Sequence, residues 1–285
     1  MTILIGLTGW GDHTTLYTDA DKKKNKLATY SSHFPVVEID SSFYAIQSQE
    51  NYDKWISETP DHFQFVIKAH QSMTGHDRIT RTIQEAKQLF QSFLESIEPV
   101  SKASKLHAIL FQFPPWFDVR VAHIQKLQKI KQLLPNQPIA IEFRNQTWFE
   151  AAHRQATLDL IKKNDWIHTI CDEPQAGEGS VPTVLEITNP TTALIRMHGK
   201  NVHGWNRNGR GGEDWRNVRY LYQYNAKELT EWATYIRQLE KMTQTVTVLF
   251  NNNSGGDASN NAKELIQLLH ISYDNLNPRQ LDLFE

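Results

Sequence analysis

The chain of 285 residues is poor in several features that mark common protein classes. Its one cysteine, Cys171, excludes an intramolecular disulfide and a cysteine-rich metal site, and a reducing cytoplasm is the expected location. No apolar run approaches 18 residues, so neither a transmembrane helix nor a membrane partner is expected. The opening residues, MTILIGLTGW, lack the basic start of a signal peptide.

The chain also lacks a surplus of charge. Lysine and arginine total 30 and aspartate and glutamate total 32, which gives a formal net charge of -2 at pH 7. Global charge therefore gives no reason to expect binding to nucleic acid or to a membrane surface. Any such binding has to come from a local patch of the surface.

What the sequence does contain is an alternation of strand-like and helix-like segments. β-rich runs occur at 3–10, 36–40, 63–70, 107–113, 139–143, 166–172, 193–199 and 246–252. Helical periodicity lies between most of them, at 80–97, 119–134, 149–163, 226–242 and 258–269. Eight parallel strands that alternate with helices predict a single α/β domain over residues 1–285, a closed (β/α)8 TIM-type barrel.

Two segments depart from this regular pattern. The residues after the sixth strand, EPQAGEGSVPTVLEITNPTT, show no clear helix, which predicts an extended loop or a short strand pair. The residues from about 275 to 285 are predicted to form a loosely docked C-terminal tail. An open doubly wound sheet is the alternative fold, but the first turn, TGWGDHTT, lacks the glycine spacing of a dinucleotide site.

Polar side chains recur at the ends of the predicted strands. Glu142 and Arg144 are two residues apart, so they point to the same side of the fifth strand. Similar pairs end other strands, namely Glu38 and Asp40, Lys68 and His70, Arg196 and His198, and Asn251 and Asn253, while Gln112 ends the fourth strand and Asp172 the sixth. Because barrels bind ligands at the carboxyl ends of their strands, the pattern predicts a polar floor there. The alternative is that these side chains only close the barrel with a network of internal salt bridges.

The loops after the last two strands suit an anion. Residues 199–220 combine glycines and tryptophans with more basic than acidic residues. Residues 251–265, NNNSGGDASNNAKEL, form a glycine turn that enters a helix. Barrels commonly bind phosphate at these two loops and a helix N-terminus, although a flexible, solvated loop has the same composition.

Aromatic residues also follow the strand ends. Trp10, Tyr44 and Trp148 belong to this group, together with Phe43, Trp116 and Trp205. Such residues can offer stacking surfaces to a base or a sugar ring. They can equally anchor loops or form an apolar lid.

The stretches VVEIDSSFY, LFQFPPWF, IEFRNQTW, IRMHG and LFNNNSGGDASNNA carry a family resemblance. The chain resembles the YecE-like family, domain of unknown function 72, over about residues 3 to 270. The resemblance implies a TIM-barrel-like fold and no settled activity. Asp40 stands where the family often has asparagine, and Asn145 where histidine often follows the arginine of the fifth strand.

The residues favour an enzyme that acts on a phosphate-bearing ligand, a nucleotide or nucleic acid, by hydrolysis or lysis. Lys68, Arg144, Arg196 and His198 would bind the anion, and Gln112, Asn251, Asp40, Tyr44, Trp10 and Trp148 would complete the ligand site. Glu142 is the candidate base, and Glu38 or Asp172 would orient a partner group. Replacing Glu142 by Gln is then expected to abolish turnover and leave folding intact.

Three alternatives remain open from the sequence. A divalent metal would find carboxylate and histidine ligands in the floor, but Lys68, Arg144 and Arg196 oppose a second cation there. No other cofactor is predicted. A non-catalytic module for single-stranded nucleic acid would use the loop 199–220 and the aromatics, and a carbohydrate hydrolase would use paired carboxylates such as Glu38 and Glu142. The sequence does not predict an oligomeric state.

Overall fold

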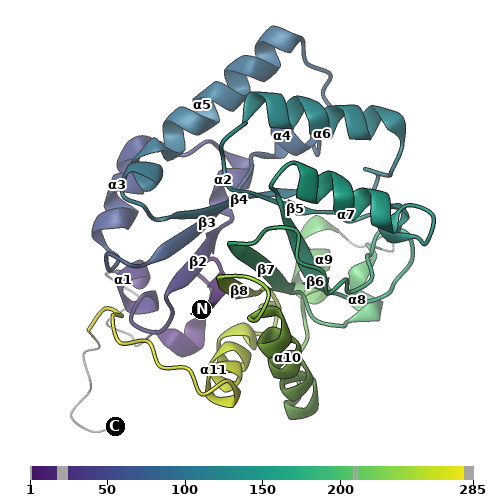
Figure 1. The fold of residues 1–285 in the computed structure, drawn as a ribbon. Helices are drawn as coiled ribbons and strands as arrows, with labels where there is room; N and C mark the ends of the chain where they lie inside the picture. The colour runs from purple at the N-terminus through teal and green to yellow at the C-terminus, as the bar shows by residue number, and fades with distance from the viewer. Residues whose placement is uncertain (1, 18–24, 208, 210, 279–285) are drawn as a thin grey trace, which may run out of the picture.

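Eight parallel strands close into a barrel in sequence order, so the predicted (β/α)8 architecture is confirmed (Figure 1). The computed structural model describes residues 2–17, 25–207, 209 and 211–278. The strands are β1 (Thr2–Thr8), β2 (Val36–Ile39), β3 (Gln64–Lys68), β4 (Leu106–Gln112), β5 (Ile139–Glu142), β6 (Ile167–Asp172), β7 (Thr192–Met197) and β8 (Thr245–Phe250). Pairing between β8 and β1 closes the barrel, which leaves no exposed edge.

Helices cover the outside of the barrel and lie over its carboxyl end. They are α1 (Lys26–Tyr30), α2 (Ser41–Tyr44), α3 (Gln49–Ser57), α4 (Gln71–Thr74), α5 (Ile83–Lys102), α6 (Val121–Leu133), α7 (Arg154–Lys163), α8 (Val202–Trp205), α9 (Gly212–Arg219), α10 (Ala226–Leu239) and α11 (Ala258–Leu268), with 3-10 turns at η1 (Thr14–Leu16) and η3 (Gln146–Phe149). Capping boxes formed by Thr82 with Glu85 and by Asn225 with Glu228 fix where α5 and α10 begin.

The alternation of side chains along each strand creates two apolar layers. The lumen holds the smaller one, formed by Val36, Val66, Ala108, Leu110, Ala140, Ile167, Leu194 and Leu249. The larger layer lies between the strands and the outer helices. Because the lumen is filled by side chains, only the carboxyl end of the barrel is left to form a polar site.

The connection from β6 to β7 contains no helix or strand over residues 173–191, as the sequence predicts. It crosses the side of the barrel as an extended segment, held by side-chain bonds such as that from His168 Nε2 to the Val184 carbonyl, at 3.1 Å. The predicted loose tail begins in the described part of the chain, where Asn277 donates to Ser31 Oγ and to the Glu58 carbonyl. Residues 279–285 of that prediction lie outside the described residues.

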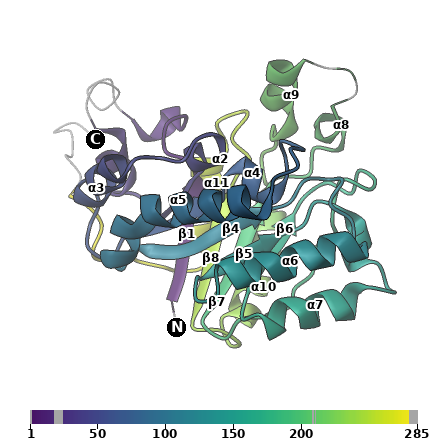
Figure 2. The ribbon, with the colours of Figure 1, turned by 90° about the horizontal axis from the view of Figure 1, so that it is seen from above.

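Four short helices mark the carboxyl end of the barrel. In Figure 2, α2, α4, α8 and α9 lie toward the end of the molecule away from the N label, where the strands finish. They belong to the loops after β2, β3 and β7, so those loops surround the predicted floor. Within the described ranges, no helix is both long and apolar enough to cross a membrane.

Candidate functional site

Arg196 is the centre of a buried ion-pair network at the carboxyl ends of the strands. Its Nε and Nη2 donate to Glu38 Oε2 and Oε1, at 2.9 and 2.7 Å. Its Nη1 donates to Glu142 Oε2 at 2.7 Å and to Gln112 Oε1 at 3.4 Å. The planar guanidinium suits such two-point bonding because its donor spacing matches that of a carboxylate. Arg196 thereby joins β7 to β2, β4 and β5.

Arg144 extends the network toward β6 and the end of β7. Its Nε donates to Glu142 Oε1 at 2.6 Å, and its Nη1 donates to Glu173 Oε2 at 2.8 Å. Its Nη2 lies 3.0 Å from His198 Nε2. The side chains of these residues are at most 1% exposed. Glu142 and Arg144 therefore share one side of their strand because each supplies the other's buried counter-charge.

Glu142 is the ionised centre of this network. Burial alone would raise the pKa of Glu142, but Arg144 and Arg196 outweigh burial and hold that pKa well below the ordinary carboxyl value. Burial raises the pKa of Glu38, which faces one of these two guanidinium groups instead of both. A carboxylate with so low a pKa and both oxygens engaged is a weak proton acceptor.

Glu173 belongs to the floor, and the sequence reasoning missed it. Glu173 Oε1 accepts from the Val181 backbone N–H at 2.6 Å, and its other oxygen binds Arg144. Burial raises its pKa to about 7 against the opposing effect of Arg144. The signal that could have identified Glu173 is the alternation of side chains. Cys171 is in register with Arg196, which faces the lumen, and Glu173 lies two residues further on, so it points the same way.

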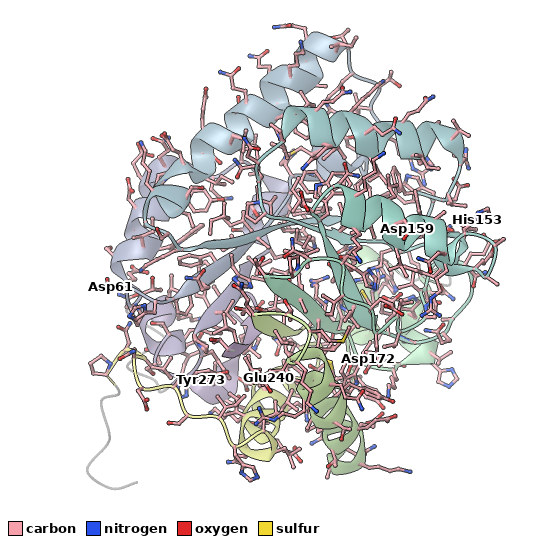
Figure 3. The ribbon with its side chains drawn as sticks, viewed as in Figure 1. Asp61, His153, Asp159, Asp172, Glu240 and Tyr273 are labelled. Atoms are coloured by element: carbon pink, nitrogen blue, oxygen red, sulfur yellow. The ribbon has the colours of Figure 1, made fainter. Side chains whose placement is uncertain are left out.

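The structure corrects the role predicted for Asp172, because its side chain points away from the floor. It accepts from Trp232 Nε1 of α10 at 3.1 Å, outside the barrel. Figure 3 accordingly shows Asp172 beside α10. A role for Asp172 in orienting groups of the floor loses its geometric basis, because neighbouring residues of a strand face opposite sides.

His198 is held as a neutral imidazole. Burial, with Arg144 as the next cause, lowers the pKa of His198 well below its ordinary value. The Nε2 of His198 lies 3.0 Å from Arg144 Nη2 and 3.5 Å from Glu142 Oε1. Its Nδ1 lies 2.9 Å from the amide nitrogen of Asn251, and contacts on both sides fix the orientation of the ring.

Above the buried network lies a layer that solvent reaches. Lys68 Nζ donates to Asp40 Oδ1 at 2.7 Å and lies 4.5 Å from the centre of the Phe43 ring. The Asp40 side chain is 34% exposed, and Gln112 and Asn251 are partly exposed. A ligand can therefore touch Asp40, Gln112 and Asn251. The Lys68 side chain is 11% exposed, and the arginines and glutamates beneath this layer are covered.

The three aromatic residues that were predicted to complete the ligand site lie in different environments. Trp148 is a correction, because it is fully buried, stacks on Phe143 at a centroid distance of 4.0 Å and donates to the Phe117 carbonyl. It offers no face to a ligand. Trp10 packs edge-on against Trp55 and is partly exposed, and Tyr44 is 53% exposed at the end of α2.

Arg219 at the end of α9 is a cation that the predicted site did not include. Its guanidinium carbon lies 4.5 Å from the Trp205 ring and 4.4 Å from the Trp215 ring. Its Nε is buried without a hydrogen-bond partner in the described part of the chain. Burial would raise the pKa of the adjacent Tyr220, but Arg219 and then Arg144 and Lys68 lower it. The basic loop 199–220 was the available signal, but sequence does not say which of its arginines turns inward.

Glu142, Cys171 and His198 are close enough to be considered as metal ligands, since their ligand atoms lie within 4.8 Å of one another. The donors fit a metal poorly. Glu142 already binds two guanidinium groups, and burial raises the pKa of the Cys171 thiol well above its usual range, so the thiolate that a metal prefers is disfavoured. The arrangement is that of a salt-bridged floor.

The paired carboxylates also lack the geometry of a glycosidase. Arg196 donates to both Glu38 and Glu142, and both carboxylates are fully buried. A glycosidase places the scissile bond of the sugar between its two carboxyl groups. Here a guanidinium occupies that place.

Comparison of the sequence with known proteins finds a family and a relative that match nearly the whole chain. The family model described as protein of unknown function DUF72 matches residues 4–282. The UPF0759 protein YunF of Bacillus subtilis (strain 168) is 49% identical over 282 residues, which cover 99% of this chain and 100% of that protein.

Two solved structures extend the comparison. A DUF72 family protein from Enterococcus faecalis V583 is 36% identical with a TM-score of 0.89, covering 99% of this chain and 100% of that one. A DUF72 family protein from Thermotoga maritima MSB8 has a TM-score of 0.79 at 23% identity, covers 95% of this chain and 100% of that one, and shows the fold alone. The resemblance found in the sequence is confirmed, and the chain belongs to the DUF72 family.

Proposed function

We propose that the protein binds a phosphate-bearing ligand, a nucleotide or nucleic acid, at the carboxyl end of the barrel and acts on it as a hydrolase or lyase. The observation that carries this proposal is the position of Arg219. It is a partly buried cation beside the floor, and its Nε has no acceptor among the described residues. A phosphate oxygen would supply that acceptor.

The surrounding charges support an anion more than a cation. Within the buried network, Arg144 and Arg196 are neutralised by Glu38 and Glu142. Outside that network, burial together with Lys68, Arg144 and Lys126 lowers the pKa of His76 to about 3. Burial is the first cause of this lowered pKa, and the cations add to it; the positive potential that these cations create would attract phosphate.

This arrangement changes the roles expected from the sequence. Arg144, Arg196 and His198 have their donors engaged inside the floor, so they would position the site and not contact phosphate. Lys68 and Arg219 are the cations placed to meet it.

The candidate base also changes. Glu142 is ionised and enclosed by two arginines, whereas Tyr220 is partly exposed and its pKa is lowered by cations. Tyr220 is therefore better suited to take a proton from an attacking water or from the ligand. The proposal includes a cytoplasmic location, in line with the single unpaired Cys171.

A second candidate function, binding of single-stranded nucleic acid without turnover, is favoured by exposed aromatics. The Trp116 ring is 41% exposed, and the Arg78 guanidinium lies 4.1 Å from it. Tyr44 is exposed as well and packs edge-on against Phe43, at a centroid distance of 5.2 Å. Stacking surfaces next to cations bind bases with little sequence preference.

A thermal-shift screen tests the proposal. The panel would hold inorganic phosphate, mononucleotides, short oligothymidylate, neutral sugars and divalent metals, with the wild type and Lys68→Met. A ligand at about 100 times its dissociation constant stabilises by about 2.7 kcal/mol, which moves the midpoint by several degrees. Shifts with phosphate-bearing compounds that Lys68→Met loses are expected, followed by release of product from the compound that binds. A shift without turnover would select the binding module, and no shift with any of these anions would contradict both.

A further inference from the structure

Asp172 is a carboxylate among apolar residues that face outward near the ends of neighbouring strands. Asp172 pairs in register with Met197, which pairs with Phe250, and the other two residues are buried and apolar. Asp172 is itself only 4% exposed. A carboxylate in an apolar layer costs free energy unless polar partners or a ligand compensate it.

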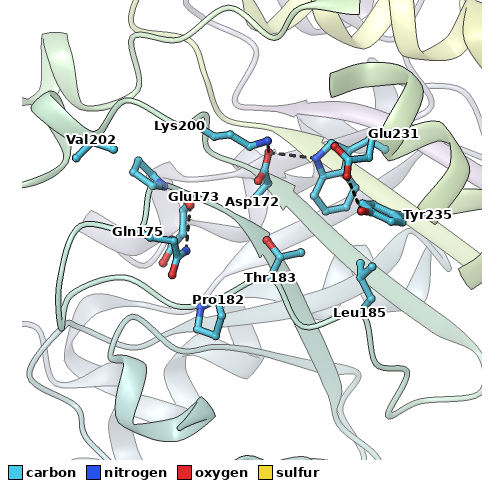
Figure 4. Close-up of a pocket in the computed structure, with 12 residues that line it drawn as sticks. Asp172, Glu173, Gln175, Pro182, Thr183, Leu185, Lys200, Val202, Glu231 and Tyr235 are labelled. Atoms are coloured by element: carbon cyan, nitrogen blue, oxygen red, sulfur yellow. Dashed lines mark hydrogen bonds and ion pairs between the residues drawn. The ribbon is translucent and has the colours of Figure 1, made fainter. Parts of the chain in front are cut away.

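A cavity of about 500 Å³ opens beside Asp172, in the place where a helix after β6 would pack in a regular barrel (Figure 4). The extended segment supplies one wall, with Pro182, Thr183 and Leu185 facing across it. The other wall comes from α10 and the residues after β7. A volume of this size matches the sites that hold small organic molecules.

The inner end of the cavity holds more negative than positive charge. Lys200 lies 3.9 Å from Asp172 and 3.3 Å from Glu228, so this lysine is shared between two carboxylates. Glu231 adds a further carboxylate to the lining. Burial raises the pKa of Asp172, and Lys200 opposes that effect only in part. An anion would therefore meet Lys200 already neutralised.

Aromatic rings line the same wall as the carboxylates. Trp232 and Tyr235 of α10 meet edge-to-face, with centroids 5.6 Å apart. Trp232 Nε1 donates to Asp172 and Tyr235 OH donates to Glu231, which holds both rings in the lining of the cavity. Ring faces beside carboxylates attract an organic cation through both charge and the ring quadrupole.

We propose that this cavity is a second binding site, which takes a small organic cation with an apolar body, a primary amine being the simplest case. The ammonium group would lie between Asp172 and Glu231. The apolar body would pack between the α10 rings and the wall formed by Pro182 and Leu185. The cavity is also lined by Glu173, which belongs to the floor, but the two carboxylates proposed to bind the cation, Asp172 and Glu231, lie on the outer side of the barrel and are separate from the phosphate site.

Calorimetric titration with phenethylamine tests this site, with phenethyl alcohol as the uncharged probe of similar shape. The wild type should bind the amine at least tenfold more tightly than the alcohol. Asp172→Asn should weaken amine binding about tenfold, which corresponds to about 1.4 kcal/mol. Glu231→Gln should weaken it several-fold, and because Glu231 is exposed its replacement leaves folding intact.

Glu240→Gln is the matched control, since Glu240 follows the same helix and pairs with Arg237 away from the cavity. It should bind the amine as the wild type does. Absence of amine binding to the wild type, equal binding of the alcohol, or equal binding by Glu231→Gln would overturn the proposal. Arg219→Gln should leave amine binding unchanged, so failure of the phosphate site and failure of this site are distinguishable.

Discussion

Replacing Glu142 by Gln is expected to destabilise the fold, contrary to the expectation from sequence alone. Glu142 accepts from Arg144 through Oε1 and from Arg196 through Oε2. A glutamine has one acceptor oxygen, so its NH₂ group would point at one of the two guanidiniums. Breaking a buried ion pair by removing one partner typically costs about 3–5 kcal/mol, because the other charge is left uncompensated.

The pH dependence of this loss follows from the lowered pKa of Glu142. A carboxyl whose pKa is lower in the folded than in the unfolded state stabilises the fold above the unfolded value, about 4.3. That stabilisation is lost as the pH falls toward the folded value. The difference in unfolding free energy between wild type and Glu142→Gln should therefore be constant from about pH 6 to 8 and shrink below about pH 4.

Urea denaturation followed by circular dichroism at pH 7 and pH 3 measures both quantities. Glu98→Gln is the matched control, because Glu98 and Lys102 form an exposed ion pair with side chains 51% and 71% exposed, and its loss should leave stability almost unchanged. A loss below about 1 kcal/mol at pH 7 for Glu142→Gln, or a loss that does not shrink in acid, would refute the description of Glu142 as the ionised centre of the floor.

Three further predictions test other parts of the description. Trp148→Ala should lower the unfolding free energy by about 3–5 kcal/mol in urea denaturation, because the ring is fully buried against Phe143, yet the folded variant should bind phosphate compounds normally. The pKa of Glu173, raised to about 7, makes stability fall as the pH rises from about 4.5 to 7, and Glu173→Gln should flatten this decline when denaturation is compared at pH 5 and 7.5. Tyr220 should ionise below pH 10 in an ultraviolet absorbance titration, and Arg219→Gln should shift that ionisation upward; an unchanged curve would count against the positive potential.

The fold was predictable because its signals are local. Each strand is an apolar run that can be recognised on its own. Helices such as α5 and α10 begin at capping boxes, whose residue pattern is visible in the sequence. The missing helix after β6 was visible for the same reason, as a stretch without helical periodicity.

The site was predictable only in part, because which way a residue faces depends on the register of a whole strand. The i, i+2 pattern correctly brought Glu38, Glu142, Arg144 and Arg196 together. On β6 the prediction was wrong by one residue: it assigned Asp172 to the floor, although the side chain that faces the floor is that of Glu173.

Loop residues were harder to assign than strand residues. Arg219 lies on a short helix whose packing depends on contacts with distant aromatic rings. Nothing in the local sequence distinguishes Arg219 from the neighbouring arginines of that loop. Trp148 was wrongly predicted to face a ligand. It follows the end of a strand, but its ring lies in the core and donates to the Phe117 carbonyl.

Calorimetric titration of wild type and Arg219→Gln with a short oligothymidylate at two salt concentrations tests the central claim most directly. Arg237→Gln, which removes a half-exposed arginine from α10, is the control. Binding is expected to weaken with salt, to weaken at least tenfold in Arg219→Gln and to be unchanged in the control. Equal binding by all three proteins, or none by the wild type, would contradict a phosphate site at the carboxyl end of the barrel.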